Sequence, residues 1–461
     1  MGLMEISSVV YFFSLSFIVF ALATLALYWS SPRKARNVIL LIASYVFYCT
    51  WDYRFLSLVI FSTVVDYYAA RMIEDKETKR KFFLVVSLST NLTVLFIFKY
   101  CQFFVDSFVE FASVFGMTPG KTELNIILPL GISFYTFQSM SYVIDVYRKK
   151  MQAHRSFREF ALFVSYFPQL IAGPIERAGY LLPQILREKK WSDVPVKEAI
   201  YLFSWGFFKK RVIADYLELA INNGYATQEK PGLMTLLGFL AIVFKLYADI
   251  SGYADMARGV SLLFGIRLST NFLFPYFSKN PSEYWKRWHI TLSVWVRHYV
   301  FTPLITRFRI PELAIIVTFL VMGAWLGPQL HFLLWGLYWG ICVLTYQYFL
   351  KWNIWQNWFM LVMIFLGQTF FHATGLTSYV DLLLSIGHNF SDVFFLTPYY
   401  YKAIFIVTLF MGYDYYLYKK QDELLVSKLS FYHQAAFYGG LFFLYRNIGQ
   451  VAATDFVYFQ H

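Results

Sequence analysis

Charged side chains are scarce in this 461-residue chain, because only 15% of its residues are Asp, Glu, Lys or Arg. Hydrophobic residues make up 58%, aromatic residues 22%, and the mean hydropathy is +0.49. A soluble domain is far less apolar, and the apolar runs recur from end to end instead of forming one anchor. The composition therefore predicts an integral membrane protein, with residues 1–461 forming a single polytopic membrane domain.

Cysteine is also rare. The three cysteines, Cys49, Cys101 and Cys342, lie far apart in apolar runs. Their spacing fits neither a disulfide framework nor a zinc site, so we expect buried thiols and no metal centre.

A basic n-region is missing at the N-terminus, which carries Glu5 instead. The apolar run over about 9–29 is long for a signal peptide and lacks a convincing cleavage site. We therefore expect it to be a retained first span. If the basic loops at 31–37 and 71–81 are both cytoplasmic, 38–70 is a hairpin and the N-terminus is extracytoplasmic.

Acidic residues are outnumbered, 28 against 40 basic ones, which gives a net charge of +12. The basic residues stand in short clusters between apolar runs, as the positive-inside rule requires. Headgroup-facing loops on the lipid bilayer explain these clusters better than nucleic-acid binding, since no separate basic domain accompanies them. The clusters are Arg33/Lys34/Arg36, Lys79/Arg80/Lys81, Arg148/Lys149/Lys150 and Arg187/Lys189/Lys190.

Several apolar segments are too short to cross the hydrocarbon core, which takes about 20 helical residues. The segments 38–50 and 159–175 are candidates for tilted, half-spanning or re-entrant helices. The second contains Pro168 and Pro174, and such breaks are tolerated in a membrane only where protein or water surrounds them.

An ordered series of motifs carries a family resemblance. It includes LPLGISFYTFQ at 128–138, FPQLIAGP at 167–174, GFFKK at 206–210, LYADISGYADMA at 246–257, NFLFPY at 271–276 and SEYWKRWHITLSVW at 282–295. These motifs, with YCTWDYRF at 48–55, resemble the membrane-bound O-acyltransferase (MBOAT) family over about residues 8–340. The similarity is to its bacterial branch, which contains the alginate O-acetyltransferases and the teichoic-acid D-alanylation protein.

The resemblance implies an all-α polytopic protein of the bacterial inner membrane. It implies a bundle of roughly 11–13 transmembrane or re-entrant helices around a central funnel or tunnel, with residues 341–461 as C-terminal membrane helices. In an active member, a cytoplasmic thioester donor (acyl-CoA or an acyl-carrier phosphopantetheine) meets a buried histidine. The acyl group leaves for an exported polysaccharide or protein hydroxyl.

Two carboxylates lie in apolar sequence at Asp249 and Asp255, where a charge is unfavourable unless it is paired or faces water. One interpretation is a structural pair with Lys245 or Arg258. The other is a substrate cavity, which Tyr253 would also line. The residues alone leave both open.

The run Trp285, Lys286, Arg287, Trp288 and His289 sets two cations and an imidazole among aromatic side chains. It suits either an interfacial mouth for a phosphate-bearing donor or an aromatic belt with snorkelling cations. The resemblance favours the first, because His289 matches the first histidine of the family's motifs.

The sequence departs from the family where chemistry is expected. In the run GAWLGPQLH at 323–331, Leu326 occupies the position where the family has its presumed catalytic histidine. We expect the preceding residue, Trp325, to line the cavity. A leucine cannot accept a proton from an acceptor hydroxyl. His298 replaces an acidic residue, and Trp339 stands where a second histidine is common.

His331 could replace the lost base. On an ideal helix it would face about 140° away from Leu326, but Gly327 and Pro328 can break the helix. We predict a catalytically degenerate member that serves as scaffold, chaperone or regulatory partner of another envelope or membrane protein, and that binds no cofactor. The alternative is an active O-acyltransferase that uses His289 or His331.

Overall fold

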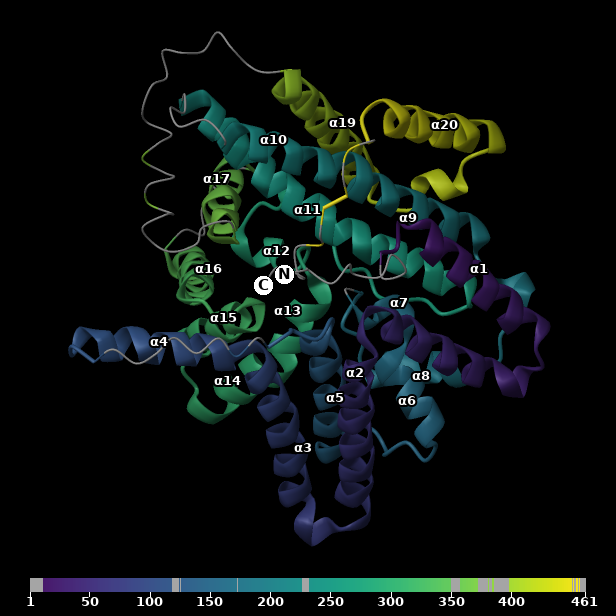
Figure 1. Ribbon diagram of the computed structural model, residues 1–461, viewed down its shortest axis with the longest axis vertical. Helices are drawn as coiled ribbons and strands as arrows, with labels where there is room; N and C mark the ends of the chain where they lie inside the picture. Colours follow the sequence, from purple (N-terminus) through teal and green to yellow (C-terminus); the bar gives the residue numbers. More distant parts are fainter. Residues whose placement is uncertain are drawn as a thin grey trace. The chain divides into compact units, whose positions relative to one another are not determined.

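The computed structural model describes residues 11–117, 124, 126–171, 173–225, 232–349, 357–371, 380, 384, 398–449, 451, 453–454 and 456. All regular secondary structure in these ranges is helical (Figure 1), as expected for an all-α protein. The chain separates into two compact units. Unit 1 contains residues 1–195 and 260–269, and unit 2 contains residues 196–259 and 270–461.

Unit 1 is built around the long helix α2, Arg33–Asp75, which packs against α1, α3, α5 and α6. Buried Asp66 of α2 accepts hydrogen bonds from Asn91 of α3 at 2.8 and 3.0 Å. The bounds of its helices are α1 Leu15–Ser30, α3 Arg80–Leu95, α4 Cys101–Val114, α5 Ile132–Tyr147, α6 Phe157–Ser165, α7 Phe167–Leu170 and α8 Ala178–Leu186.

Two helical segments of α2 meet at a kink inside the predicted hairpin over 38–70. The kink lies at Asp52, whose φ of −160° and ψ of 111° are not helical. The hairpin as a pair of membrane crossings stays a prediction. The segment 159–175 is broken as predicted, into the short helices α6 and α7.

Unit 2 contains the predicted site residues. Its helices are α9 Val196–Phe208, α10 Asp215–Tyr225, α11 Gly232–Leu263 (whose last turn belongs to unit 1), α12 Pro281–Tyr284, α13 Ile290–Val296, α14 Thr302–Phe308, α15 Pro311–Leu326, α16 Leu330–Tyr348, α17 Asn357–Gln368, α19 Pro398–Lys420 and α20 Phe431–Asn447. Two π-helical turns, Lys209–Ala214 and Arg297–Phe301, extend α9 and α13.

Three helices among the described residues are long and apolar enough to cross a membrane: residues 33–75, 77–113 and 236–263. Shorter apolar helices accompany them at 15–30, 311–326 and 359–368. The expected total of membrane helices, the funnel and the side on which the N-terminus lies stay predictions.

Helices α9 and α11 cross with their backbones in contact. A Cβ atom on Gly206 would lie 2.5 Å from the carbonyl oxygen of Gly252, so only glycine fits there. Small residues at such a crossing allow membrane helices to approach closely. Because of this crossing, Lys209 and Lys210, which follow α9, lie beside Asp255 and Asp249 of α11.

Candidate functional site

His289 lies between α12 and α13 in a left-handed backbone conformation, with φ 41° and ψ 56°. This conformation is uncommon for a residue other than glycine and is found where the surrounding structure imposes it. Asn271 fixes the turn, because its side-chain oxygen accepts hydrogen bonds from the backbone and hydroxyl of Thr291 at 3.1 and 2.9 Å. His289 is thereby buried, with 1% of its surface exposed.

Aromatic rings surround His289. Its ring lies edge-on to Trp325 of α15, with the centroids 5.8 Å apart, and tilted against Phe272 at 5.7 Å. Sequence reasoning placed His289 and Trp325 in one site, and the structure brings these two side chains into contact.

The two cations before His289 do not share its environment. Trp285 and Trp288 are buried, whereas Lys286 is exposed and Arg287 is half-buried. The Arg287 guanidinium pairs with Glu283 at 2.9 Å and donates a hydrogen bond to the Leu273 carbonyl. This segment therefore buries its tryptophans, exposes Lys286 and holds the Arg287 guanidinium in contacts within the protein.

Helices α15 and α16 form a tightly packed hairpin (Figure 1). A Cβ atom on Gly323 would lie 2.2 Å from the carbonyl oxygen of Phe332, so the two backbones touch at the end of α15. Leu326 is the last residue of α15, and its side chain is buried with 5% exposed.

The helix breaks after Leu326, where Gly327 is extended, and α16 starts at Leu330. The ideal-helix projection that turned His331 away from residue 326 therefore does not apply. His331 is buried in the first turn of α16, and its ring lies 4.3 Å from that of Phe332. Its Nε2 atom has no hydrogen-bond partner among the described residues.

The other two departures from the family pattern are also packed. Trp339 is fully buried and stacks on Tyr284, with centroids 4.9 Å apart, and meets Trp285 edge-on at 5.2 Å. His298 lies in the π-helical turn after α13, where its Nδ1 donates to the Val294 carbonyl at 2.8 Å.

Asp249 belongs to a buried group of charges. Lys210 lies 2.8 Å from Asp249 and 3.1 Å from Asp215, and Arg211 also pairs with Asp215. The predicted partner Lys245 is wrong, because Lys245 pairs with Glu218. A buried carboxylate of this kind is stabilised by its partner, and removal of the partner leaves an uncompensated charge.

Asp255 pairs with Arg258 at 3.0 Å, as the structural interpretation predicted, and also with Lys209. Arg258 lies 2.7 Å from Glu423 as well. Glu423 follows α19, in the C-terminal part of the chain where we predicted no site residue. Lys209 and Lys210 were also not predicted as partners of these carboxylates. Their position inside an apolar run was the feature of the sequence that could have indicated it.

An aromatic bridge connects α11 with the surroundings of His289. Tyr247 of α11 contacts Phe272 and Trp288, with centroids 6.2 and 6.1 Å apart, and donates to buried Asp414 of α19 at 3.0 Å. Tyr253, one turn after Asp249, is fully buried and lies under the Lys210 ammonium at 5.9 Å. The predicted site residues thus lie in one unit. A cavity lined by Asp249, Tyr253 and Asp255 stays a prediction.

Comparison with known proteins identifies a family. The sequence model of the membrane-bound O-acyltransferase family, MBOAT, matches residues 9–360. The "Probable alginate O-acetylase AlgI" of Pseudomonas aeruginosa is 39% identical over 329 residues, which cover 69% of this chain and 62% of that protein.

More distant relatives have related names. The "Peptidoglycan O-acetyltransferase" of Helicobacter pylori is 34% identical over 67% of this chain and 64% of that protein. The "Teichoic acid D-alanyltransferase" of Bacillus subtilis is 28% identical over 52% of this chain and 64% of its own length. The chain thus spans less than two thirds of the length of these relatives.

Proposed function

Because the chain belongs to the membrane-bound O-acyltransferase family, we propose that it keeps the family's membrane architecture and has lost its proton-transfer step. In this proposal it turns over no acyl donor. It acts as a scaffold, chaperone or regulatory partner of an envelope complex in the bacterial inner membrane.

The observation that carries the proposal is the buried Leu326 at the end of α15. In O-acyl transfer the acceptor oxygen attacks the thioester carbonyl, the C–O bond forms, the C–S bond breaks, and a proton moves from the hydroxyl to a base. The Leu326 side chain has no lone pair to take that proton. Its neighbour Trp325 already packs against His289, so the one histidine kept from the motif faces an indole.

The packing of Trp339 supports the same conclusion. A catalytic histidine at this position would need polar surroundings that orient its ring. The indole of Trp339 instead lies between Tyr284 and Trp285, in an aromatic stack that leaves the position apolar. Both positions where the family commonly has histidine thus hold buried apolar side chains.

A second candidate is an active O-acyltransferase. The names of the relatives favour it, and so does His331, a buried imidazole whose Nε2 has no partner among the described residues. In this version a thioester donor, acyl-CoA or acyl-carrier phosphopantetheine, would transfer its acyl group to an exported hydroxyl. His331 would accept the hydroxyl proton and return it to the departing thiolate, so atoms and charge balance.

Acetyl-CoA turnover in proteoliposomes separates the two candidates. The purified chain is supplied with acetyl-CoA and alginate or peptidoglycan fragments, and free CoA thiol and acetylated product are measured. The degenerate protein releases CoA at the rate of protein-free liposomes. Turnover that disappears in His331→Gln or His289→Ala, while both variants keep normal folding, would contradict the proposal and establish the enzyme.

A further inference from the structure

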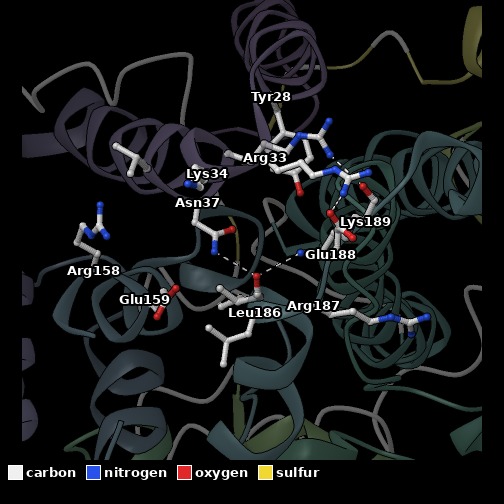
Figure 2. Close-up of a pocket in the computed structure, with 13 residues that line it drawn as sticks. Tyr28, Arg33, Lys34, Asn37, Arg158, Glu159, Leu186, Arg187, Glu188 and Lys189 are labelled. Carbon is white, nitrogen blue, oxygen red and sulfur yellow. Dashed lines mark hydrogen bonds and ion pairs between the residues drawn. The ribbon is translucent and has the colours of Figure 1, made fainter. Parts of the chain in front are cut away.

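A basic pocket of about 540 Å³ lies in unit 1, whereas His289, Leu326 and His331 belong to unit 2. It is formed by the end of α1, the first turns of α2 and α6, and the end of α8 with the residues that follow it (Figure 2). Six basic side chains and two acidic ones line it: Arg33, Lys34, Arg36, Arg158, Arg187 and Lys189, with Glu159 and Glu188.

Both acidic residues are already engaged. Glu188 pairs with Arg33, and Glu159 lies 2.9 Å from His154. The exposed side chains of Lys34, Arg158 and Arg187 form no ion pair with any described residue. Three positive charges therefore border the pocket without a counter-ion among the described residues, and an anionic ligand would supply one.

The wall of the pocket is fixed by hydrogen bonds. Arg36 donates to the Lys189 carbonyl at 3.0 Å, and Asn37 donates to the Ile185 carbonyl at 3.2 Å. The Arg36 guanidinium also lies over the ring of Trp29, 4.7 Å from its centroid. These contacts join α2 to the end of α8 and to the basic segment that follows it, and so fix one wall of the pocket.

Two tryptophans beside the pocket indicate the level at which it would lie in a bilayer. Trp29 meets Trp191 edge-on, with centroids 5.4 Å apart, and Trp191 is half exposed. Tryptophan is enriched at the level of the lipid headgroups. A ligand in this pocket would have its phosphate at that level.

An apolar groove lies farther along α2, on the same helix face as one residue of the pocket. Val38 lines the pocket, and Ile42, Tyr45, Val46 and Cys49 line a separate groove on the same helix. Their spacing of four, seven, eight and eleven residues from Val38 places them on one face. That face runs for about 16 Å, close to the ~15 Å of hydrocarbon in one leaflet.

We propose that this surface binds an anionic phospholipid, with its phosphate headgroup at Lys34, Arg158 and Arg187 and an acyl chain along the Val38–Cys49 face of α2. The positive charge selects an anionic headgroup, and the adjoining apolar face selects a ligand that carries a hydrocarbon chain. The inference is independent of whether unit 2 transfers acyl groups.

Lipid binding to the purified full-length chain tests the headgroup. Native mass spectrometry compares phosphatidylglycerol with phosphatidylcholine of the same acyl chains, and phosphatidylglycerol is expected to bind at least tenfold more tightly. Each basic residue near a membrane surface contributes about fivefold in affinity, so Lys34→Gln/Arg158→Gln should weaken phosphatidylglycerol binding about thirtyfold.

The matched control is Lys81→Gln/Arg307→Gln, which also removes one lysine and one arginine charge, at exposed positions that do not line the pocket. It should retain wild-type binding. Equal binding of the two lipids, or an equal effect of the two double variants, would overturn the headgroup site.

Two further experiments test whether an acyl chain occupies the groove on α2. Val46→Trp should fill the groove and weaken phosphatidylglycerol binding, whereas Val85→Trp, at a position of matched exposure on α3 (50% against 49%), should not. Glycerol 1-phosphate serves as the chain-free probe. If it competes at the same concentration as phosphatidylglycerol, or if Val46→Trp binds normally, the ligand is a free phosphate and the lipid proposal is wrong.

Discussion

The imidazole of His289 lies edge-on to the indole of Trp325, with the ring centroids 5.8 Å apart. Trp325 directly precedes Leu326, so the position of the lost base lies one residue along α15 from the contact with His289. The surroundings of His289 are aromatic on the Phe272 side as well. A histidine restored at position 326 would therefore enter an apolar site.

For this reason Leu326→His alone should not create an acyltransferase. His298 and Trp339 still replace polar groups of the family pattern, and Trp339 is locked in its aromatic stack. CoA release from acetyl-CoA by the variant should equal that of wild type and of protein-free liposomes. Turnover in this single variant would mean that Leu326 was the only defect.

The contact between α15 and α16 should not tolerate a methyl group at Gly323. A Cβ there meets the Phe332 carbonyl at 2.2 Å, so Gly323→Ala should lower the free energy of unfolding by about 1–3 kcal/mol. The control is Gly439→Ala on α20, where no atom lies within 4 Å of the added Cβ. That change should be neutral or slightly stabilising. Thermal unfolding in detergent compares the two.

Lys210 should be required for stability. Lys210→Met leaves Asp249 buried without its partner at 2.8 Å, which should destabilise the protein by about 3–5 kcal/mol. The exposed Lys402→Met should change stability by less than about 0.5 kcal/mol. If both variants unfold at the wild-type temperature, Asp249 faces water and the structural interpretation of this pair fails.

Lys189 should make stability depend on pH. Burial, with the positive charges of Arg36 and Arg187, lowers the pKa of Lys189 from 10.5 to about 8. Between these two values the unfolded chain keeps the proton that the folded chain has lost, so the stability contributed by this group rises with pH.

The unfolding temperature of wild type relative to Lys189→Met should therefore rise as the pH goes from 7.5 to 10, and stay constant below about 7. The other side chains that line the pocket are the same in both proteins, so the difference isolates Lys189. Arg187→Gln removes one repelling cation and should shift the rise to higher pH. A difference that does not vary with pH would contradict the assignment.

Local sequence predicted the breaks in the fold well. The Gly327–Pro328 step ends α15, and the Pro168 region separates α6 from α7, because proline cannot continue a regular helix. Asp52 gave no comparable signal. Two helical segments of α2 meet at a kink there, and the spacing of the basic loops did not predict its position.

The sequence predicts the partner of a buried carboxylate only when both residues lie on the same helix. Asp255 and Arg258 are three residues apart on one helix, so their pairing follows from helical spacing. Asp249 and Lys210 meet only because α9 and α11 cross at Gly206 and Gly252. That crossing depends on tertiary packing and cannot be derived from residue spacing.

Removal of both candidate bases in the living cell tests the central claim most directly, because it requires no assumption about the acyl donor. The gene is replaced by His289→Ala/His331→Gln, and the deletion phenotype, the membrane abundance and the O-acyl content of the purified envelope are measured. Gly323→Leu serves as a structurally disabled control. The account predicts that the double variant matches wild type in all three. Loss of function with loss of envelope O-acyl groups, at normal membrane abundance, would contradict it and show that the chain is an acyltransferase.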